Sequence, residues 1–270
     1  MATVLYEARP DGVCLITLNR PQRHNALTMD MQHEYFKALR RAEGDTSVRV
    51  VVVTGAGRSF CVGADMDLLV ATSRAGGRDE AVTDKTLEHA QLRLQSKPIV
   101  AAINGAAAGL GLVLALWCDV RFVASGAKLT FSFSHRGLVA EHGVSWILPR
   151  VVGASRALDL LLTSRVVLGT EAVGLGLANY SGSDAESTLD AAIAYAQGLA
   201  ASASPASMCE IRRAVYADLS KGPEEASSEA ISLMTASFSH PDAAEGVASY
   251  VERRGPNFQG LGAGTIRSRL

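Results

Sequence analysis

Two glycine-flanked turns in the sequence could do chemistry with the backbone rather than with side chains. The first is VGAD, residues 62–65, and the second is AAGLG, residues 107–111; each joins a strand-like run to a helix-like run. Glycine lets another molecule approach closely, and the free N–H groups lie at the positive end of a helix. Two such groups converging on one point would bind an oxygen that gains negative charge, as in an enolate. Either turn alone is more simply explained as a tight turn with close helix packing.

The glycines of this chain do not fit the common nucleotide-binding motifs. Gly55 and Gly57 follow a strand-like run as G-x-G, but Cys61 rather than a third glycine follows, at the wrong spacing. The chain also lacks the Gly-Lys-Ser/Thr of a P-loop, the G-x-S-x-G of a nucleophile elbow and a Tyr-x-x-x-Lys pair. A nicotinamide-dependent enzyme is therefore the weaker alternative.

Alternating strand-like and helix-like runs in the first half of the chain would position the two turns. VRVVVVTGAG, residues 48–57, is a β-branched run typical of a strand buried on both faces. Thr28 is placed to cap an amphipathic helix that runs to about Ala42, and a further helix is expected over residues 85–95. From Val144 onward the pattern is almost purely helical. The alternation predicts an α/β fold, and the helical last third predicts a separate layer or subdomain.

Composition excludes several classes of partner. The 270 residues carry a net charge of -1, so no basic field favours nucleic acid or an anionic membrane surface. The N-terminus lacks a secretory pattern, and the longest apolar run, residues 110–118, is too short to span a bilayer. The four cysteines are scattered without a C-x-x-C pair, which favours reduced thiols over a metal site or disulfides: Cys14, Cys61, Cys118 and Cys209. These features predict a cytoplasmic protein without metal, nucleic-acid or membrane partners.

Five segments, taken in order, resemble the crotonase (enoyl-CoA hydratase/isomerase) superfamily over nearly the whole chain. They are NRPQRHNAL (19–27), VVVTGAGRSFCVGADM (51–66), KPIVAAINGAAAGLGLVLALWCD (97–119), LPRVVGASRALDLLLTSRVVLGTEAVGLGLAN (148–179) and SYVERRGPNF (249–258). The resemblance implies a crotonase-type superhelix of β-β-α units over residues 1–200, which holds an acyl-CoA site. It implies a C-terminal helical region over residues 201–270 that mediates a homotrimer or a dimer of trimers.

The resemblance also implies which residues bind the substrate. The N–H groups of Ala64 and Leu110 would form an oxyanion hole for an acyl-CoA thioester, although most members carry glycine where Leu110 stands. Coenzyme A would enter as part of the substrate, with no permanently bound cofactor. The residues implied along its path are Arg23, His24, Ala26, Asp65, Met66 and Asp67. Tyr250 and Arg253 match tail positions that reach coenzyme A from a neighbouring subunit or helix. Asp65 has the alternative role of a cap or dipole partner at a helix start.

The acids that a hydratase of this family uses are replaced in this chain. The first glutamate position holds Val113, and the second falls in the pair Ser132-Phe133. Glu141 matches the position where other members carry an aspartate that faces the same pocket. In an apolar segment at a helix start, burial would raise the pKa of Glu141 toward proton transfer; the alternative is an exposed cap residue.

The neighbours of Glu141 have lesser predicted roles. His135 and His142 are lesser candidates because imidazole is a side chain suited to proton transfer, but both are better explained as loop or packing residues. Phe133 and Trp146 are expected to wall the pocket. One carboxylate suits a double-bond isomerisation better than hydration, so the sequence predicts an isomerase or an atypical enoyl-CoA hydratase. A non-catalytic acyl-CoA-binding protein with the same fold is the alternative.

Overall fold

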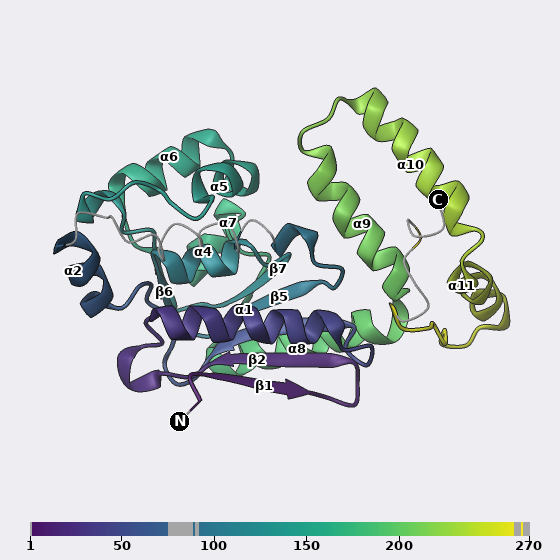
Figure 1. Cartoon of the computed structure of the whole chain (residues 1–270), viewed down its shortest axis with the longest axis horizontal. Coiled ribbons are helices and arrows are strands. Elements are labelled where there is room, and N and C mark those ends of the chain that lie inside the picture. Colours follow the sequence, from purple (N-terminus) through teal and green to yellow (C-terminus); the bar gives the residue numbers. More distant parts are fainter. Residues whose placement is uncertain (1, 75–88, 90–91, 262–265, 267–270) are drawn as a thin grey trace.

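The computed structural model describes residues 2–74, 89, 92–261 and 266, and two sheets form its framework (Figure 1). The larger sheet has the order β1 (Val4–Ala8), β2 (Val13–Leu18), β3 (Val50–Gly55), β5 (Ile99–Ile103), β7 (Val120–Ala124), β10 (Tyr180–Gly182). The smaller sheet has the order β4 (Ser59–Cys61), β6 (Ala106–Ala108), β8 (Lys128–Thr130), β9 (Val167–Leu168). β1 and β2 form an antiparallel hairpin, and β2, β3, β5, β7 and β10 pair in parallel.

The chain alternates between the two sheets, which confirms the predicted α/β fold of β-β-α units. β3 of the larger sheet leads to β4 of the smaller one and then to α2 (Met66–Arg74). β5 leads in the same way to β6 and α4 (Leu110–Leu116), and β7 leads to β8. Every residue of β3 and β5 is buried, as their continuous apolar runs predict for strands covered on both faces.

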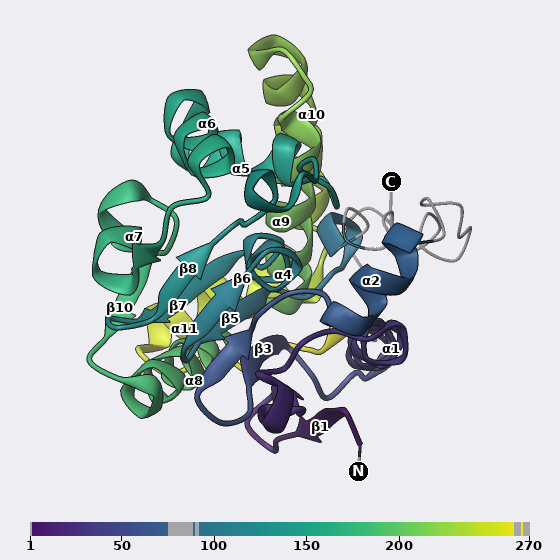
Figure 2. The same cartoon turned by 90° about the vertical axis from the view of Figure 1, so that its left-hand side faces the viewer.

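Helices cover both faces of the larger sheet (Figure 2). α1 (Met29–Gly44) packs on β1 and β2, and α8 (Ala185–Ser202) packs on β3, β5 and β7. The predicted cap of α1 is confirmed, because Thr28 Oγ1 accepts a hydrogen bond from Met31 N at 3.2 Å. The helix expected over residues 85–95 lies largely outside the described residues, of which Leu92–Leu94 form a 3-10 helix, η2.

The remaining helices follow β8 in the chain. They are η3 (Ser134–Arg136), α5 (Val144–Val152), α6 (Ala154–Thr163), α7 (Gly169–Leu175), α9 (Pro205–Asp218), α10 (Pro223–Ser237) and α11 (Pro241–Glu252); η1 (Pro21–Arg23) precedes α1. α10 and α11 extend away from the sheets in Figure 1. The assignment of residues 201–270 to oligomerisation stays a prediction. Within the described part of the chain, no helix is both long and apolar enough to cross a membrane.

Candidate active site

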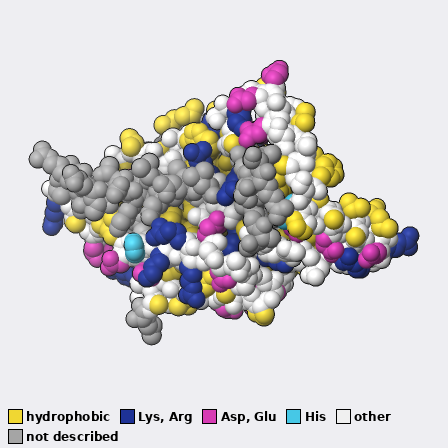
Figure 3. Space-filling model, turned by 45° about the vertical axis from the view of Figure 1, so that its right-hand side comes forward, with side chains coloured by type: hydrophobic (Ala, Val, Ile, Leu, Met, Phe, Trp, Pro, Cys, Tyr) yellow, Lys and Arg dark blue, Asp and Glu magenta, His cyan; other side chains and the backbone are white. Residues whose placement is uncertain are grey.

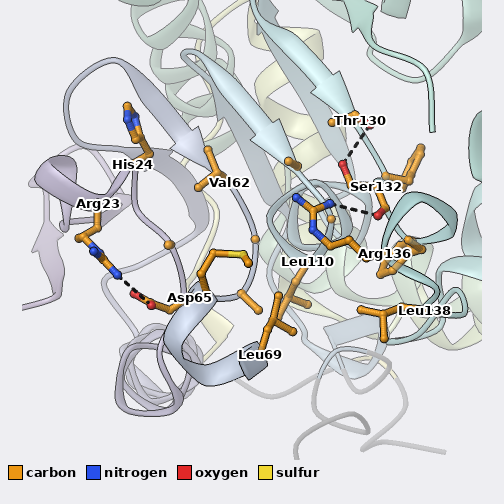
Figure 4. Close-up of a pocket in the computed structure, with 18 of the residues that line it drawn as sticks. Arg23, His24, Val62, Asp65, Leu69, Leu110, Thr130, Ser132, Arg136 and Leu138 are labelled. Carbon is orange, nitrogen blue, oxygen red and sulfur yellow. Dashed lines mark hydrogen bonds and ion pairs between the residues drawn. The ribbon is translucent and has the colours of Figure 1, made fainter. Parts of the chain in front are cut away.

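A cavity of about 690 Å³ lies where the strands of the smaller sheet lead into α2 and α4 (Figure 4). It is lined by residues 22–24, 26, 62–67, 69, 108–110, 130–133, 136, 138 and 141. The lining includes both glycine-flanked turns and Glu141. The fold therefore brings together the two turns and the acid that the sequence places about 30 residues further on.

The two turns touch, and only glycine allows this contact. Gly63 has φ +98°, and a Cβ built on it would lie 2.8 Å from Ala108 O and 3.5 Å from Leu110 N. A Cβ on Gly111 would lie 2.1 Å from Cys61 O, so α4 approaches β4 closely as well. Close packing thus accounts for part of the glycine pattern. It does not account for the N–H groups of the residues beside these glycines.

Among the described residues, the N–H groups of Ala64 and Leu110 do not take part in the hydrogen bonds that surround them. Leu27 N donates to Gly63 O at 2.8 Å, and Asp65 N donates to Leu27 O at 2.9 Å, on either side of Ala64. Gly109 N donates to Thr130 O at 2.9 Å, and Leu110 is the first residue of α4, where an N–H has no acceptor within the helix. Neither the Ala64 N–H nor the Leu110 N–H donates to any residue in the described ranges. Both residues line the cavity.

On one side of the cavity, charges neutralise one another. Asp65, with a side chain 4% exposed, pairs with Arg20 at 3.0 Å and with Arg23 at 3.2 Å, and Arg23 also pairs with Asp67. Asp67 N donates to Asp65 Oδ1 at 3.1 Å, so Asp65 is a cap at the start of α2. Burial alone would raise the pKa of Asp65, but the hydrogen bonds from Asp67 N, Arg20 and Arg23 outweigh it and lower the pKa. We call Arg23, Asp65 and Asp67 the paired wall.

On the other side of Leu110, the positions of the two expected glutamates carry no acid. Val113 is fully buried in the core and does not line the cavity, whereas Ser132 and Phe133 do line it. The Leu110 side chain is 5% exposed and belongs to the same hydrophobic core. Of the described acids, those lining the cavity are Asp65, Asp67 and Glu141.

Glu141 lines the cavity, but its predicted burial is wrong. Its side chain is 42% exposed, because it lies in the loop before α5 and not inside the helix. Its Oε1 lies 3.3 Å from Nε2 of His142, whose side chain is only 8% exposed. Trp117 Nε1 donates to His142 O at 2.9 Å, and the His142 ring packs on His89 at a centroid distance of 4.6 Å. The buried His142 thus contacts the exposed carboxylate of Glu141.

Arg136 is a cavity residue that the sequence reasoning missed. It closes η3, and its Nη1 donates to Ser132 O at 3.1 Å. Figure 4 shows Arg23 and Asp65 on one side of Leu110 and Arg136 on the other. The signal in the sequence is its position three residues after Phe133, a residue that the sequence analysis places at the pocket wall. We call Arg136 and Glu141 the open wall.

Comparison with known proteins identifies the family. Residues 8–261 match the family described as enoyl-CoA hydratase/isomerase. The chain belongs to this family. It is 36% identical over 275 residues to "Probable enoyl-CoA hydratase EchA12" of Mycobacterium tuberculosis, which covers 96% of this chain and 93% of that one. It is 32% identical over 250 residues to a "Probable enoyl-CoA hydratase" of Bacillus subtilis, with 92% and 95% covered. A crystal structure of an enoyl-CoA hydratase from Bacillus anthracis has a TM-score of 0.87, 27% identity, and 96% and 99% coverage.

The residues that the resemblance to the enoyl-CoA hydratase/isomerase family implied divide into two groups. The first group lines the cavity: Arg23, His24, Ala26, Ala64, Asp65, Met66, Asp67, Leu110, Phe133 and Glu141. Trp146 is not among the described lining residues, so its predicted role as a pocket wall is not met. Its ring stacks on Trp117 at 6.0 Å, and the Arg150 guanidinium lies 4.1 Å from its centroid. His135 is exposed on η3 and lies outside the described lining.

Two further residues that the resemblance implied, Tyr250 and Arg253, lie far from the cavity within one chain. Tyr250 lies on α11 and is 84% exposed, and Arg253 ends that helix. α2, beside the cavity, and α11 lie at opposite ends of Figure 1. Neither residue is among the described residues that line the cavity.

Metal and thiol chemistry have little support in the described residues. No group of three or more His, Cys, Asp or Glu side chains there could hold a metal ion. The four cysteines are free and buried, and burial raises the pKa of both Cys61 and Cys118 to about 12. A neutral buried thiol is a poor nucleophile.

Proposed function

We propose that this chain processes an acyl-CoA thioester, with the N–H groups of Ala64 and Leu110 as the oxyanion hole and Glu141 as acid and base. One observation carries the proposal: both spare N–H groups and the Glu141 carboxylate belong to the same cavity. The acyl-CoA class is supported by the family, whose relatives are named enoyl-CoA hydratases.

The N–H groups would act on the thioester oxygen. When a proton leaves the carbon next to the thioester, negative charge moves onto that oxygen and an enolate forms. Donors fixed beforehand at this oxygen stabilise the enolate without reorganisation, and one such donor is worth about 100- to 1,000-fold in turnover. The apolar side chains of Leu110 and Phe133 line the same cavity, are each 5% exposed, and strengthen these bonds by excluding water.

Glu141 would move the proton. In a double-bond isomerisation, its carboxylate removes a proton from one carbon, and the resulting carboxylic acid returns a proton to the carbon two positions away. Acid and base act one after the other, so one carboxylate is enough. Asp65 is unsuited to this role because two arginines hold its charge, which leaves Glu141 as the acid of the open wall.

Hydration of an enoyl-CoA is the second candidate reaction. Thr130 Oγ1 donates to Ser164 O at 2.8 Å and lies 3.2 Å from Ser132 Oγ at the cavity, so both hydroxyl oxygens could accept hydrogen bonds from a water molecule. Incubating the pure protein with 2-enoyl, 3-enoyl, dienoyl and aromatic CoA thioesters separates the two reactions. Mass spectrometry reports the gain of water, and the ultraviolet spectrum reports a moved double bond. Tight binding without turnover of any thioester would instead favour a non-catalytic binding protein.

Replacing Glu141 by glutamine tests the acid–base assignment. Glu141→Gln keeps the shape of the side chain but removes the proton-transfer group, so turnover of the active thioester should fall about 100- to 10,000-fold. Steady-state kinetics measure this. Glu171→Gln is the matched control, because Glu171 is also 42% exposed and lies outside the cavity lining. Full activity of Glu141→Gln would overturn the assignment.

We also propose that the chain forms a homotrimer or a dimer of trimers through its last helices. α10 and α11 expose large apolar side chains that a monomer would leave in water: Ile231, Met234, Phe238, Val247, Tyr250 and Val251. Figure 3 shows hydrophobic side chains gathered on the protruding right-hand end of the molecule, where α11 lies. In such an assembly Tyr250 and Arg253 could reach coenzyme A bound to a neighbour. Light scattering of the chain in solution tests this part of the proposal.

A further inference from the structure

Arg136 presents a guanidinium to the cavity with most of its donors unused. A guanidinium carries five N–H donors, and the bond from Nη1 to Ser132 O uses one of them. No described carboxylate lies within ion-pair distance of Arg136. Figure 4 shows the side chain pointing into the cavity from η3, next to Ser132.

The other arginine at the cavity already has acid partners. Arg23 is held by Asp65 and Asp67, and Glu141 lies beside His142. Arg136 is therefore the cavity cation that no acid in the described ranges neutralises. Its bond to Ser132 O holds the side chain without changing its charge.

The surroundings of Arg136 determine which chemical group binds favourably next to its charge. Leu69, Leu110 and Leu138 line the same cavity and lower the dielectric around a bound molecule. An alkyl tail placed there would take water from the guanidinium and offer no acceptor in return, which is costly. A carboxylate would accept two parallel hydrogen bonds from the planar guanidinium and neutralise its charge.

We propose that Arg136 binds a carboxylate at the far end of the acyl group, so that the substrate is the thioester of a dicarboxylic acid. The inference rests on the proposed function, since it places the acyl group in the same cavity. Arg23 lies on the side of Leu110 assigned to coenzyme A, and Arg136 lies on the opposite side, which is left for the acyl group. A phosphate of coenzyme A is the other anion that a guanidinium could bind, and the experiment separates the two.

The test compares thioesters of equal length that differ in a terminal methyl or carboxylate. Glutaryl-CoA and pentanoyl-CoA form one such pair, and succinyl-CoA and butanoyl-CoA form a shorter one. By calorimetry, the wild-type protein should bind the carboxylate of at least one pair about 10- to 100-fold more tightly, as expected for a charged hydrogen-bonded contact. Arg136→Gln should abolish this preference, and Arg136→Lys should keep part of it.

The control variant is Arg156→Gln. Arg156 is also exposed and also donates to a backbone oxygen, Leu175 O, but it lies outside the cavity lining. This variant should keep the full preference of the wild-type protein. Thermal unfolding of all three variants checks that the fold is intact, which the exposure of both arginines leads us to expect.

Three results would overturn the inference, and they differ in what they say about the proposed function. Equal wild-type affinity within both pairs would exclude a carboxylate subsite and leave the acyl-CoA function standing. If Arg136→Gln weakens both members of a pair equally, and the loss vanishes with pantetheine thioesters that lack phosphates, Arg136 binds coenzyme A instead. Failure of every thioester to bind would remove the proposed function together with the inference.

Discussion

The two walls of the cavity use charge in different ways. On the paired wall, Asp65 is 4% exposed and its charge is shared between Arg20 and Arg23. On the open wall, Arg136 contacts only a backbone oxygen, and Glu141 is 42% exposed beside His142. Charges neutralised by the chain itself hold the site in shape, whereas charges left over are able to act on a bound molecule.

The local backbone explains why the two walls differ. The paired wall follows β4 directly, so Asp65 caps α2 and fixes the segment that carries the Ala64 N–H. The two residues of the open wall lie in short turns. In these turns Ser132, Gly137 and His142 adopt positive φ angles of 56°, 66° and 54°. These turns leave Arg136 and Glu141 exposed, which suits residues that meet a substrate.

Between the two walls, the largest effect is expected from losing one of the N–H groups of Ala64 and Leu110. Leu110→Pro removes one donor, and proline is tolerated at the first position of a helix. Turnover should fall about 100- to 1,000-fold, as for other oxyanion donors. Leu110→Ala, which keeps the N–H, is the control and should retain turnover within about tenfold of the wild-type rate. Equal losses in both variants would mean that the side chain matters and the N–H does not.

A smaller effect, on stability, tests the paired wall. Asp65→Asn leaves Arg20 and Arg23 without their shared acid and should lower the free energy of unfolding at pH 7 by about 2–3 kcal/mol. The pKa of Asp65 is lowered in the folded chain. Its contribution is therefore present above the ordinary aspartate pKa of about 3.9 and is lost as the pH falls through the lower folded pKa.

Denaturant unfolding across this pH range measures the difference between the wild-type protein and Asp65→Asn. The difference should shrink below about pH 4. Asp67→Asn is the matched control, because Asp67 shares Arg23 but is 91% exposed, and its change should stay below about 1 kcal/mol. A difference between the wild-type protein and Asp65→Asn that does not change with pH would contradict the assignment of the paired wall.

Sequence reasoning captured the parts of the site that depend on the backbone. Buried β-branched runs, the Thr28 cap and the glycine turns are local patterns with few structural solutions, so they predicted the α/β fold class and the two junctions, whereas the superhelix of β-β-α units came from the resemblance. The position of Glu141 at the cavity came from the resemblance and agrees with the cavity lining.

The predictions that were wrong or missing depend on loop conformation and on side-chain orientation. The apolar neighbours of Glu141 predict that it is buried, yet the loop before α5 leaves it exposed. Trp146 faces Trp117 because α5 turns it that way, and a helix start predicted from a few residues cannot set this angle. Arg136 lies in a short polar turn without periodicity, so only the folded chain shows that it reaches the cavity.

The smallest expected effect comes from replacing His142, the buried residue that contacts the Glu141 carboxylate on the open wall. His142 Nε2 lies 3.3 Å from Glu141 Oε1, and the ring is fixed by His89 and by the bond from Trp117 to the His142 backbone. His142→Leu removes this contact and lets the carboxylate move, so kcat should fall about tenfold while KM changes little. His142→Gln, whose amide can donate to the carboxylate, should recover most of kcat. If both variants lose activity equally and also unfold at lower temperature, His142 serves only packing, and Glu141 is positioned by the substrate itself.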